Sequence, residues 1–333
     1  MMRVFISGFG NVGQGTMELI LIKKDMIQKE FGPVSIVGVM DSKSYTVNQN
    51  GVCEFMVLGN KTATGRCKED RAGRTGPEIL DLVDYDVLIE CSPTNIDDGG
   101  EGLRNIRHAL GNGKDVITVN KGPLALEFGE IMSIADRNGC IIRYEGSVGG
   151  SMPIINLNRE ALVGQSIRSI HGIFNGTCNF ILSRMDSGMP FGQALREAQQ
   201  LGYAETDPTY DIEGIDSACK VTILANSVFG RNVTIKDVSI TGISSVTEEA
   251  VKLASDHDMV IRLIGEVSKD SLSVAPRLIP KGHPLSISGT LNTAVIETDF
   301  AGPITVSGRG AGRKETASAI LSDLLTIMKA RKE

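Results

Sequence analysis

The sequence lacks the features that mark several classes of protein. Its formal net charge is −6, so it has no basic excess for general nucleic-acid binding. No signal peptide is visible at its N-terminus, and its apolar runs fall far short of the roughly 20 residues of a membrane span. The six cysteines form no Cys-x-x-Cys pair and the four histidines do not cluster with them, which argues against structural zinc. These absences predict a globular cytoplasmic protein with reduced thiols.

The first part of the chain has the pattern of a parallel α/β sheet. The 333 residues exceed what one hydrophobic core usually holds, so two domains are expected. Apolar periodicity predicts strands and helices in alternation, with strands at 3–8, 34–41, 86–90 and 115–119 and helices at 11–28, 75–83, 99–111 and 123–138. Such alternation predicts a Rossmann-type, doubly wound parallel sheet over about the first 135 residues.

The pattern changes after this region. The remaining elements expected are helices at 176–186, 190–201, 214–229 and 313–330, and strands at 166–174, 259–267, 271–278 and 293–299. This order is typical of an α+β domain. The glycine-rich stretch 308–312 suits a close approach of the backbone to another group. The polar stretch 43–76 has no assigned structure and is a candidate flap over the adenosine half of a dinucleotide.

A glycine motif predicts a dinucleotide site. Gly8, Gly10 and Gly13 match G-x-G-x-x-G, directly after a predicted strand and at the start of a predicted helix. In this setting the first glycine permits a tight turn, the second lets the backbone approach the pyrophosphate, and the third lets helix and strand pack closely. The helix N-terminus supplies N–H groups and a partial positive charge for the anion. The alternative is a glycine-rich turn without a ligand.

The choice between NAD and NADP stays open. Asp41 ends the second predicted strand, where a carboxylate accepts hydrogen bonds from the adenosine ribose and favours NAD. Ser42, Lys43 and Ser44 follow at once and could hold a 2′-phosphate. Asp41 could also be no more than the cap of a loop.

Lysine and carboxylate residues are the candidates for proton transfer. The histidines lie in no motif, and the Tyr-x-x-x-Lys pair of short-chain dehydrogenases is absent. Lys121 follows a predicted strand at the edge of a parallel sheet where ligands bind, although a solvated loop lysine would look the same. Asp216 and Lys220 are four residues apart on one helix face, and the apolar run 221–225 indicates burial of a pair that could otherwise be a surface salt bridge.

Six segments, in order and spanning nearly the whole chain, resemble the homoserine dehydrogenase family. They are GFGNVG at 8–13, VNKGPLA at 119–125, YEGSVGGSMPII at 144–155, GIFNGTCNFIL at 172–182, GYAETDPTYDIEGIDSACK at 202–220, and GAG with its following helix at 310–328. The resemblance implies NAD- or NADP-dependent interconversion of homoserine and aspartate semialdehyde in threonine, methionine and isoleucine biosynthesis. It also implies a dinucleotide domain at 1–135 joined by helix 310–330, and a substrate-binding and dimerisation domain with a mixed sheet at 136–309.

The resemblance also assigns roles by position. Lys220 matches the proton donor, and Lys121 matches a second lysine beside substrate and nicotinamide. The matching substrate positions are Gly176, Thr177, Tyr203, Glu205, Asp211 and Asp216. The matching dinucleotide contacts are Phe9, Asn11, Val12, Ser92 and Gly310. A monovalent-cation site, usually described with sodium, matches Glu145 and the backbone carbonyls of Val148, Gly150 and Met152.

The sequence is shorter than many members of the family, and two alternative functions also have to be considered. The sequence ends at residue 333 and its first motif begins at residue 8, so we expect neither a C-terminal regulatory domain nor a preceding aspartate kinase domain. One rival, aspartate-semialdehyde dehydrogenase, needs a cysteine nucleophile beside a histidine base. The other is a dinucleotide sensor without turnover, because a fold does not fix a function. Neither explains the two lysines.

Overall fold

The computed structural model describes residues 1–332, which divide into two compact units. The first unit comprises Met1–Ser147 and the chain from Gly312 onward, and the second comprises Val148–Ala311. Among the described residues, no helix is both long and apolar enough to cross a membrane.

The first unit is built on a seven-stranded sheet with the order β4-β3-β2-β1-β5-β6-β7. Its strands are β1 (Met2–Ser7), β2 (Val34–Met40), β3 (Ser44–Val47), β4 (Glu69–Asp70), β5 (Val87–Glu90), β6 (Asp115–Thr118) and β7 (Ile142–Arg143). β1, β2, β5, β6 and β7 pair in parallel, while β3 and β4 add an antiparallel edge. The predicted Rossmann-type sheet is therefore confirmed.

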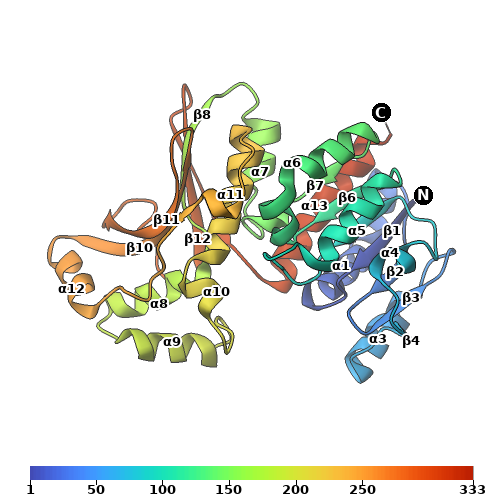
Figure 1. Ribbon diagram of the computed structural model, residues 1–333, viewed down its shortest axis with the longest axis horizontal. Helices are drawn as coiled ribbons and strands as arrows, with labels where there is room; N and C mark the ends of the chain where they lie inside the picture. Colours follow the sequence, from blue (N-terminus) through green and yellow to red (C-terminus); the bar gives the residue numbers. More distant parts are fainter. Residues whose placement is uncertain (333) are drawn as a thin grey trace. The chain divides into compact units, whose positions relative to one another are not determined.

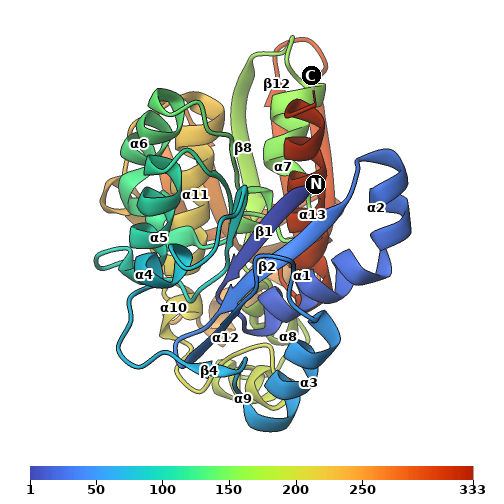
Figure 2. The same ribbon diagram turned by 90° about the vertical axis from the view of Figure 1, so that its right-hand side faces the viewer.

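Helices cover both faces of this sheet. They are α1 (Asn11–Ile22), α2 (Lys24–Glu30), α3 (Glu54–Thr64), α4 (Gly76–Leu80), α5 (Gly100–Gly111), α6 (Lys121–Arg137), the short 3₁₀ turn η1 (Glu145–Ser147) and α13 (Arg313–Ala330). Figure 2 shows α1, α2 and α13 on one face and α5 and α6 on the other. Ile320, Leu324 and Ile327 of α13 are fully buried in the same apolar cluster as β1 and β2. Each such side chain contributes about 2 kcal/mol of burial, so α13 is an integral part of the first unit.

The second unit is built on a six-stranded sheet with the order β13-β12-β8-β10-β11-β9. Figure 1 labels β8, β10, β11 and β12 of this sheet. Its strands are β8 (Ile167–Ile173), β9 (Ser239–Ile240), β10 (Met259–Ser268), β11 (Leu272–Pro280), β12 (Leu291–Thr298) and β13 (Pro303–Arg309). All pairs are antiparallel except β11 with β9, which confirms the predicted mixed sheet.

The helices of the second unit include three that carry candidate site residues, α8, α10 and α11. The set is α7 (Ile154–Asn156), the π-helical turn η2 (Leu157–Ala161), α8 (Gly176–Asp186), α9 (Phe191–Gln200), α10 (Thr209–Ile212), α11 (Ile215–Phe229), the 3₁₀ turn η3 (Ile235–Asp237) and α12 (Glu248–Asp256). α8 and α11 both pack against β10. Eleven consecutive residues of α11, from Asp216 to Asn226, are buried, as its apolar run predicts.

The sequence prediction missed β7, α7, α10, β9 and α12, and it differs from the structure in three further places. The helix expected at 11–28 is two helices, because the chain bends at Lys23, leaving Ile22 exposed and burying Ile27. The polar stretch 43–76 contains β3, α3 and β4, anchored by a few widely spaced buried residues that give no clear period. β13 was not predicted, because its Pro, Ser and Gly residues hide a weak alternation in a strand with no fully buried residue.

Candidate functional site

The turn between β1 and α1 is packed so closely that two of its three glycines are required. Gly8 has a φ of +89°, and a Cβ there would lie 2.3 Å from the backbone nitrogen of Ser92. A Cβ at Gly13 would lie 2.5 Å from the carbonyl oxygen of Gly8. By contrast, a Cβ at Gly10 would meet no atom of the described residues within 4 Å. Packing therefore explains Gly8 and Gly13, whereas Gly10 borders open space at the start of α1.

The N-terminus of α1 is suited to an anion. The helix begins after Gly10, and no side chain among residues 1–332 caps its first turn. Uncapped N–H groups and the helix dipole together attract phosphate. The Phe9 side chain is fully buried, so only its backbone could contact a ligand, whereas Asn11 is exposed and Val12 half-buried. The strand–turn–helix setting predicted for the motif is confirmed.

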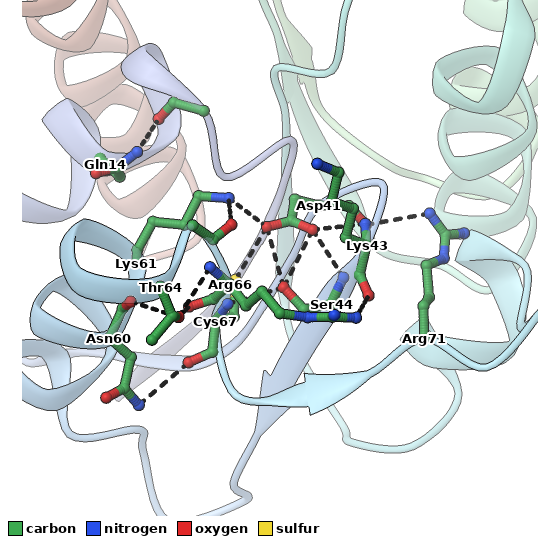
Figure 3. Close-up of polar contacts among 12 residues, drawn as sticks. Gln14, Asp41, Lys43, Ser44, Asn60, Lys61, Thr64, Arg66, Cys67 and Arg71 are labelled. Atoms are coloured by element: carbon green, nitrogen blue, oxygen red, sulfur yellow. Dashed lines mark hydrogen bonds and ion pairs between the residues drawn. The ribbon is translucent and has the colours of Figure 1, made fainter.

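The Asp41 carboxylate is engaged by neighbouring groups of the protein itself (Figure 3). Lys61 Nζ donates to it at 2.5 Å, and the backbone nitrogens of Lys43 and Ser44 each donate at 2.7 Å. The Ser44 hydroxyl lies 3.1 Å from both oxygens, and the Cys67 thiol lies 3.5 Å away. Burial by itself would raise the pKa of Asp41, but the hydrogen bonds from Lys61 and the backbone lower it below the usual value. Asp41 is therefore an ionised residue whose charge Lys61 balances.

A basic cavity lies beside this cluster. It has a volume of about 550 Å³, and Ser42 is among its lining residues. The lining carries five cationic side chains and two carboxylates: Lys43, Arg66, Arg71, Arg74, Arg104, Asp70 and Glu101. Arg66 pairs with Asp70 at 2.6 Å, and Arg71 pairs with Glu101. The remaining excess of positive charge suits an anionic group such as a phosphate.

Lys121 lies at the predicted position, directly after β6. It is the first residue of α6 and is half-buried. The preceding residue, Asn120, caps this helix by accepting from the backbone nitrogen of Gly122 at 3.2 Å. The Asn120 amide also donates to the Ser92 hydroxyl at 3.2 Å. Ser92 and Lys121, two predicted site residues, are thus joined through Asn120 at the carboxyl edge of the sheet.

The second unit contains the predicted pair of Asp216 and Lys220, and the pair is buried. Lys220 Nζ donates to Asp216 Oδ2 at 2.7 Å and to the carbonyl oxygen of Phe174 at 2.5 Å. The two residues are only 6% and 7% exposed, so the surface salt bridge is excluded. A buried pair contributes little net stability after desolvation, so its presence points to a role in function.

Asn175 connects the acidic residues around Lys220 and was missed by the sequence analysis. Its amide nitrogen lies 2.6 Å from Asp211 Oδ1 and 2.9 Å from Asp216 Oδ2. Its amide oxygen accepts from the backbone nitrogen of Cys178 at 2.8 Å and caps α8. The sequence could have indicated its capping role, because Asn175 directly precedes the predicted helix 176–186 and asparagine is a preferred N-cap residue. Asn175 therefore fixes both carboxylates relative to the N-terminus of α8.

Other predicted substrate residues lie around the same helix end. The Thr177 hydroxyl donates to the carbonyl oxygen of Tyr203 at 2.7 Å. The Tyr203 ring packs edge-on against Phe180, with 5.1 Å between the ring centres. Glu205 is exposed, and its carbonyl oxygen accepts from Gln199 at 3.1 Å. The structure thus brings Gly176, Thr177 and Tyr203 to the α8 end that also carries Asn175, with Glu205 on the loop after Tyr203.

Gly176 and Gly310 both pack closely against other segments of the same unit. A Cβ at Gly176 would lie 2.6 Å from the carbonyl oxygen of Thr290. A Cβ at Gly310 would lie 1.8 Å from the side-chain nitrogen of Asn292. These contacts explain the two glycines by packing within the second unit. The dinucleotide contact expected for Gly310 stays a prediction.

The residues of the expected cation site are buried. Glu145 is 3% exposed, and its backbone nitrogen donates to Asp323 of α13 at 3.0 Å. Val148 and Met152 are at most 1% exposed, and Gly150 is also buried. Glu145 belongs to the first unit, and the other three positions belong to the second.

Burial makes three of the thiols poor nucleophiles. It raises the pKa of Cys67 to about 12, and it raises the pKa of Cys91 and of Cys178 well above the ordinary value. A thiol attacks as the thiolate, so a raised pKa opposes covalent catalysis. This chemistry weakens the rival reading as an aspartate-semialdehyde dehydrogenase.

Comparison with known proteins gives a consistent result for both units. The family model described as homoserine dehydrogenase, NAD binding domain, matches residues 8–145, and the one described as homoserine dehydrogenase matches residues 153–325. A homoserine dehydrogenase of Methanocaldococcus jannaschii is 45% identical over all of both chains. A crystal structure of a putative homoserine dehydrogenase from Archaeoglobus fulgidus has a TM-score of 0.92 and 47% identity, covering 98% of this chain and 99% of that one. A hyperthermophilic archaeal homoserine dehydrogenase in complex with NADPH has a TM-score of 0.85 and 30% identity, covering 98% and 97%.

Proposed function

Because the chain belongs to the homoserine dehydrogenase family, we propose that Lys220 transfers the proton that accompanies hydride transfer. The enzyme uses NAD or NADP to interconvert L-homoserine and L-aspartate 4-semialdehyde, a step of threonine, methionine and isoleucine biosynthesis. In the reducing direction, a hydride from the nicotinamide adds to the aldehyde carbon. The oxygen then carries a developing negative charge, and the Lys220 ammonium donates a proton to it.

The observation that carries this proposal is how Lys220 is held. An ammonium group has three N–H donors, and the described residues accept two of them, at Asp216 and Phe174. The third donor is left for a ligand oxygen. Asp216 and the backbone carbonyl fix the amine, which is how a general acid is kept in hydrogen-bonding reach of its substrate. We assign Lys121 as a second cation beside the nicotinamide.

The carboxylates near Lys220 suit the amino-acid end of the substrate. L-Homoserine carries an α-ammonium group that requires anionic or carbonyl acceptors. We assign this role to Glu205 and Asp211, with Tyr203, Thr177 and the Gly176 backbone completing the pocket. The exposed Glu205 carboxylate is able to accept a charged ligand, and its interaction gains strength when the ligand excludes water.

We further assign a monovalent cation, such as sodium, to Glu145 and the carbonyl oxygens of Val148, Gly150 and Met152. Hard cations prefer oxygen donors, and one carboxylate with three neutral carbonyls balances a single positive charge. The ion would take no part in hydride or proton transfer.

Isotope transfer tests the reaction itself. Homoserine that carries deuterium on its hydroxyl-bearing carbon should deliver that deuterium to the nicotinamide, and mass spectrometry of the reduced cofactor detects it. A dinucleotide sensor on the same fold would bind the cofactor and transfer no deuterium.

For the cofactor, we propose a preference for NADP over NAD of less than about a thousandfold. Asp41 is occupied by Lys61 and backbone donors, which weakens its ability to select the ribose of NAD. The adjacent basic cavity offers Lys43 and arginines to a 2′-phosphate. Because a carboxylate is still present, NAD should remain a substrate. Steady-state kcat/KM for each cofactor measures the ratio. A preference for NAD, or a preference for NADP above a thousandfold, contradicts the proposal.

Lys61→Ala should shift this ratio toward NAD by about tenfold, a change of about 1.4 kcal/mol. Without Lys61, the Asp41 carboxylate becomes available to ribose hydroxyls and repels a 2′-phosphate. Lys68→Ala is the matched control, because Lys68 is an exposed lysine of the same polar stretch. It should leave the ratio unchanged. A ratio that moves equally in both variants would mean that only the general positive charge matters.

We also propose a homodimer joined through the region 140–300. Its second unit exposes several large apolar side chains, and association with a second copy would remove apolar surface from water. They include Val163, Leu253, Leu278, Leu291 and Phe300, each more than 40% exposed. Sedimentation velocity at micromolar concentration should give the mass of two chains. A single species of monomer mass would contradict this assembly.

A cytoplasmic location is part of the same proposal. All six cysteines are free thiols, which fits a reducing compartment.

A further inference from the structure

Glu90 is a fully buried carboxylic acid that the mechanism does not use. It is the last residue of β5, a central strand of the first unit, and has no exposed surface. Burial raises the pKa of its carboxyl above the usual value, although several groups donate hydrogen bonds to it. A buried carboxyl group is costly, and a leucine would fill the same place in an ordinary core. Its presence therefore requires an explanation.

The contacts of Glu90 join three segments at the carboxyl edge of the sheet. The backbone nitrogen of Ser92 donates to Glu90 Oε1 at 2.8 Å. The Asn105 amide of α5 donates to Glu90 Oε2 at 3.2 Å and to the Ser7 hydroxyl at 3.1 Å. Ser7 ends β1, directly before the glycine turn. One carboxyl group thus fixes the loop after β5 to α5 and to the end of β1.

A second set of contacts extends this network to Lys121. The Ser92 hydroxyl accepts from Asn120, which caps α6 immediately before Lys121. α5 packs closely against Asn120, because a Cβ at Gly102 of α5 would lie 2.4 Å from the Asn120 amide nitrogen. A displacement of Ser92 would therefore displace Asn120 and the first turn of α6.

We propose that Glu90 is a positioning residue for the dinucleotide and for Lys121, acting through Ser92, Asn105 and Asn120. It touches neither ligand. It sets the distance between the glycine turn after β1, the loop after β5 and the first turn of α6. The role of Lys121 rests on the proposed function, whereas the effect on dinucleotide binding does not.

Asp115 provides a matched comparison. It is also a buried carboxylate on the parallel sheet, but it begins β6 at the opposite edge. It pairs with Arg331 at 2.5 Å and accepts from the backbone nitrogen of Ile141 at 2.7 Å. Replacing either carboxylate removes buried hydrogen bonds of the same unit. Only Glu90 lies at the edge where the dinucleotide is expected.

The test compares Glu90→Leu, Glu90→Gln and Asp115→Leu in the full-length enzyme. Glu90→Leu should raise the Kd for NADPH, read by cofactor fluorescence, about tenfold to a hundredfold and lower kcat by at least about tenfold, since small misplacements are expensive in catalysis. Glu90→Gln should stay within about threefold of the parent, because it keeps the acceptor for Ser92 and can donate to a reoriented Asn105 amide. Asp115→Leu should lower the melting temperature and leave the Kd unchanged.

Three results would overturn the proposal: an unchanged Kd in folded Glu90→Leu, an equal rise in Asp115→Leu, or failure of Glu90→Gln to restore binding. If Glu90→Leu does not fold, Asn105→Ala takes its place, and it should raise the Kd about tenfold because it cuts the link between Glu90 and Ser7. The Kd for NADPH can be measured by cofactor fluorescence in a protein that does not turn over. A protein that binds NADPH normally but does not oxidise homoserine would therefore contradict the proposed function and leave the test of Glu90 intact.

Discussion

Lys220→Ala should lower kcat for homoserine oxidation about 10²–10⁴-fold and leave the Kd for the dinucleotide nearly unchanged. This is the range for the loss of one general acid–base group. The lysine lies in the second unit, while the glycine turn expected to bind the cofactor lies in the first, so binding and proton transfer should separate cleanly. Stopped-flow turnover at saturating substrate and cofactor fluorescence give the two numbers.

Two further lysines serve as comparisons. Lys281→Ala removes an exposed lysine of the same unit, paired with Asp258 at 3.7 Å, and should leave turnover unchanged. Lys121→Ala should lower kcat less than Lys220→Ala and also weaken cofactor binding. If Lys220→Ala keeps near-normal turnover while Lys121→Ala does not, Lys121 is the proton donor and the assignment is wrong.

Gly10→Ala should raise the dinucleotide Kd about a hundredfold without lowering thermal stability. A Cβ at this position meets no described protein atom within 4 Å, and its φ of −87° is open to alanine. The only cost should come from the ligand, because the added methyl group occupies the space into which the pyrophosphate must come. Fluorescence titration and a melting curve measure the two effects.

Alanine variants of two other glycines serve as controls for Gly10→Ala. Gly111 also has nothing near its Cβ position, but it lies at the far end of α5, so Gly111→Ala should change neither quantity. Gly8→Ala should lower stability, because its Cβ would collide with the loop after β5. A Gly10→Ala variant that binds normally would place the dinucleotide elsewhere.

The buried parallel strands and the regular helices could be predicted from sequence because their side chains repeat with a clear period. β1 and β5 each contain a run of three buried apolar residues, and α13 has buried apolar residues on one face along its length. β3 has only four residues, of which the first two are both buried, and β4 has two exposed residues, so neither strand shows an alternating pattern. The bend at Lys23 depends on the core that receives Ile27, which is a property of the whole unit.

In the candidate site, contacts within one helix could be predicted from sequence, whereas contacts between distant segments could not. Asp216 and Lys220 could be paired from sequence because both lie on one helix, four residues apart. The links made by Asn175 and Glu90 could not, since their partners come from segments that are brought together only by the fold. Asp41 shows the converse. Its place at the end of β2 was correctly predicted, but the partner that engages its carboxylate, Lys61, is twenty residues away on α3.

Absorbance at 340 nm tests the central claim most directly. The purified protein is mixed with L-homoserine and NADP or NAD, and separately with aspartate semialdehyde and phosphate in the presence of either oxidised cofactor. We predict that absorbance rises with homoserine, faster with NADP than with NAD, and stays flat with aspartate semialdehyde and phosphate. A flat trace with homoserine, together with a rise in the phosphate reaction, would contradict the account.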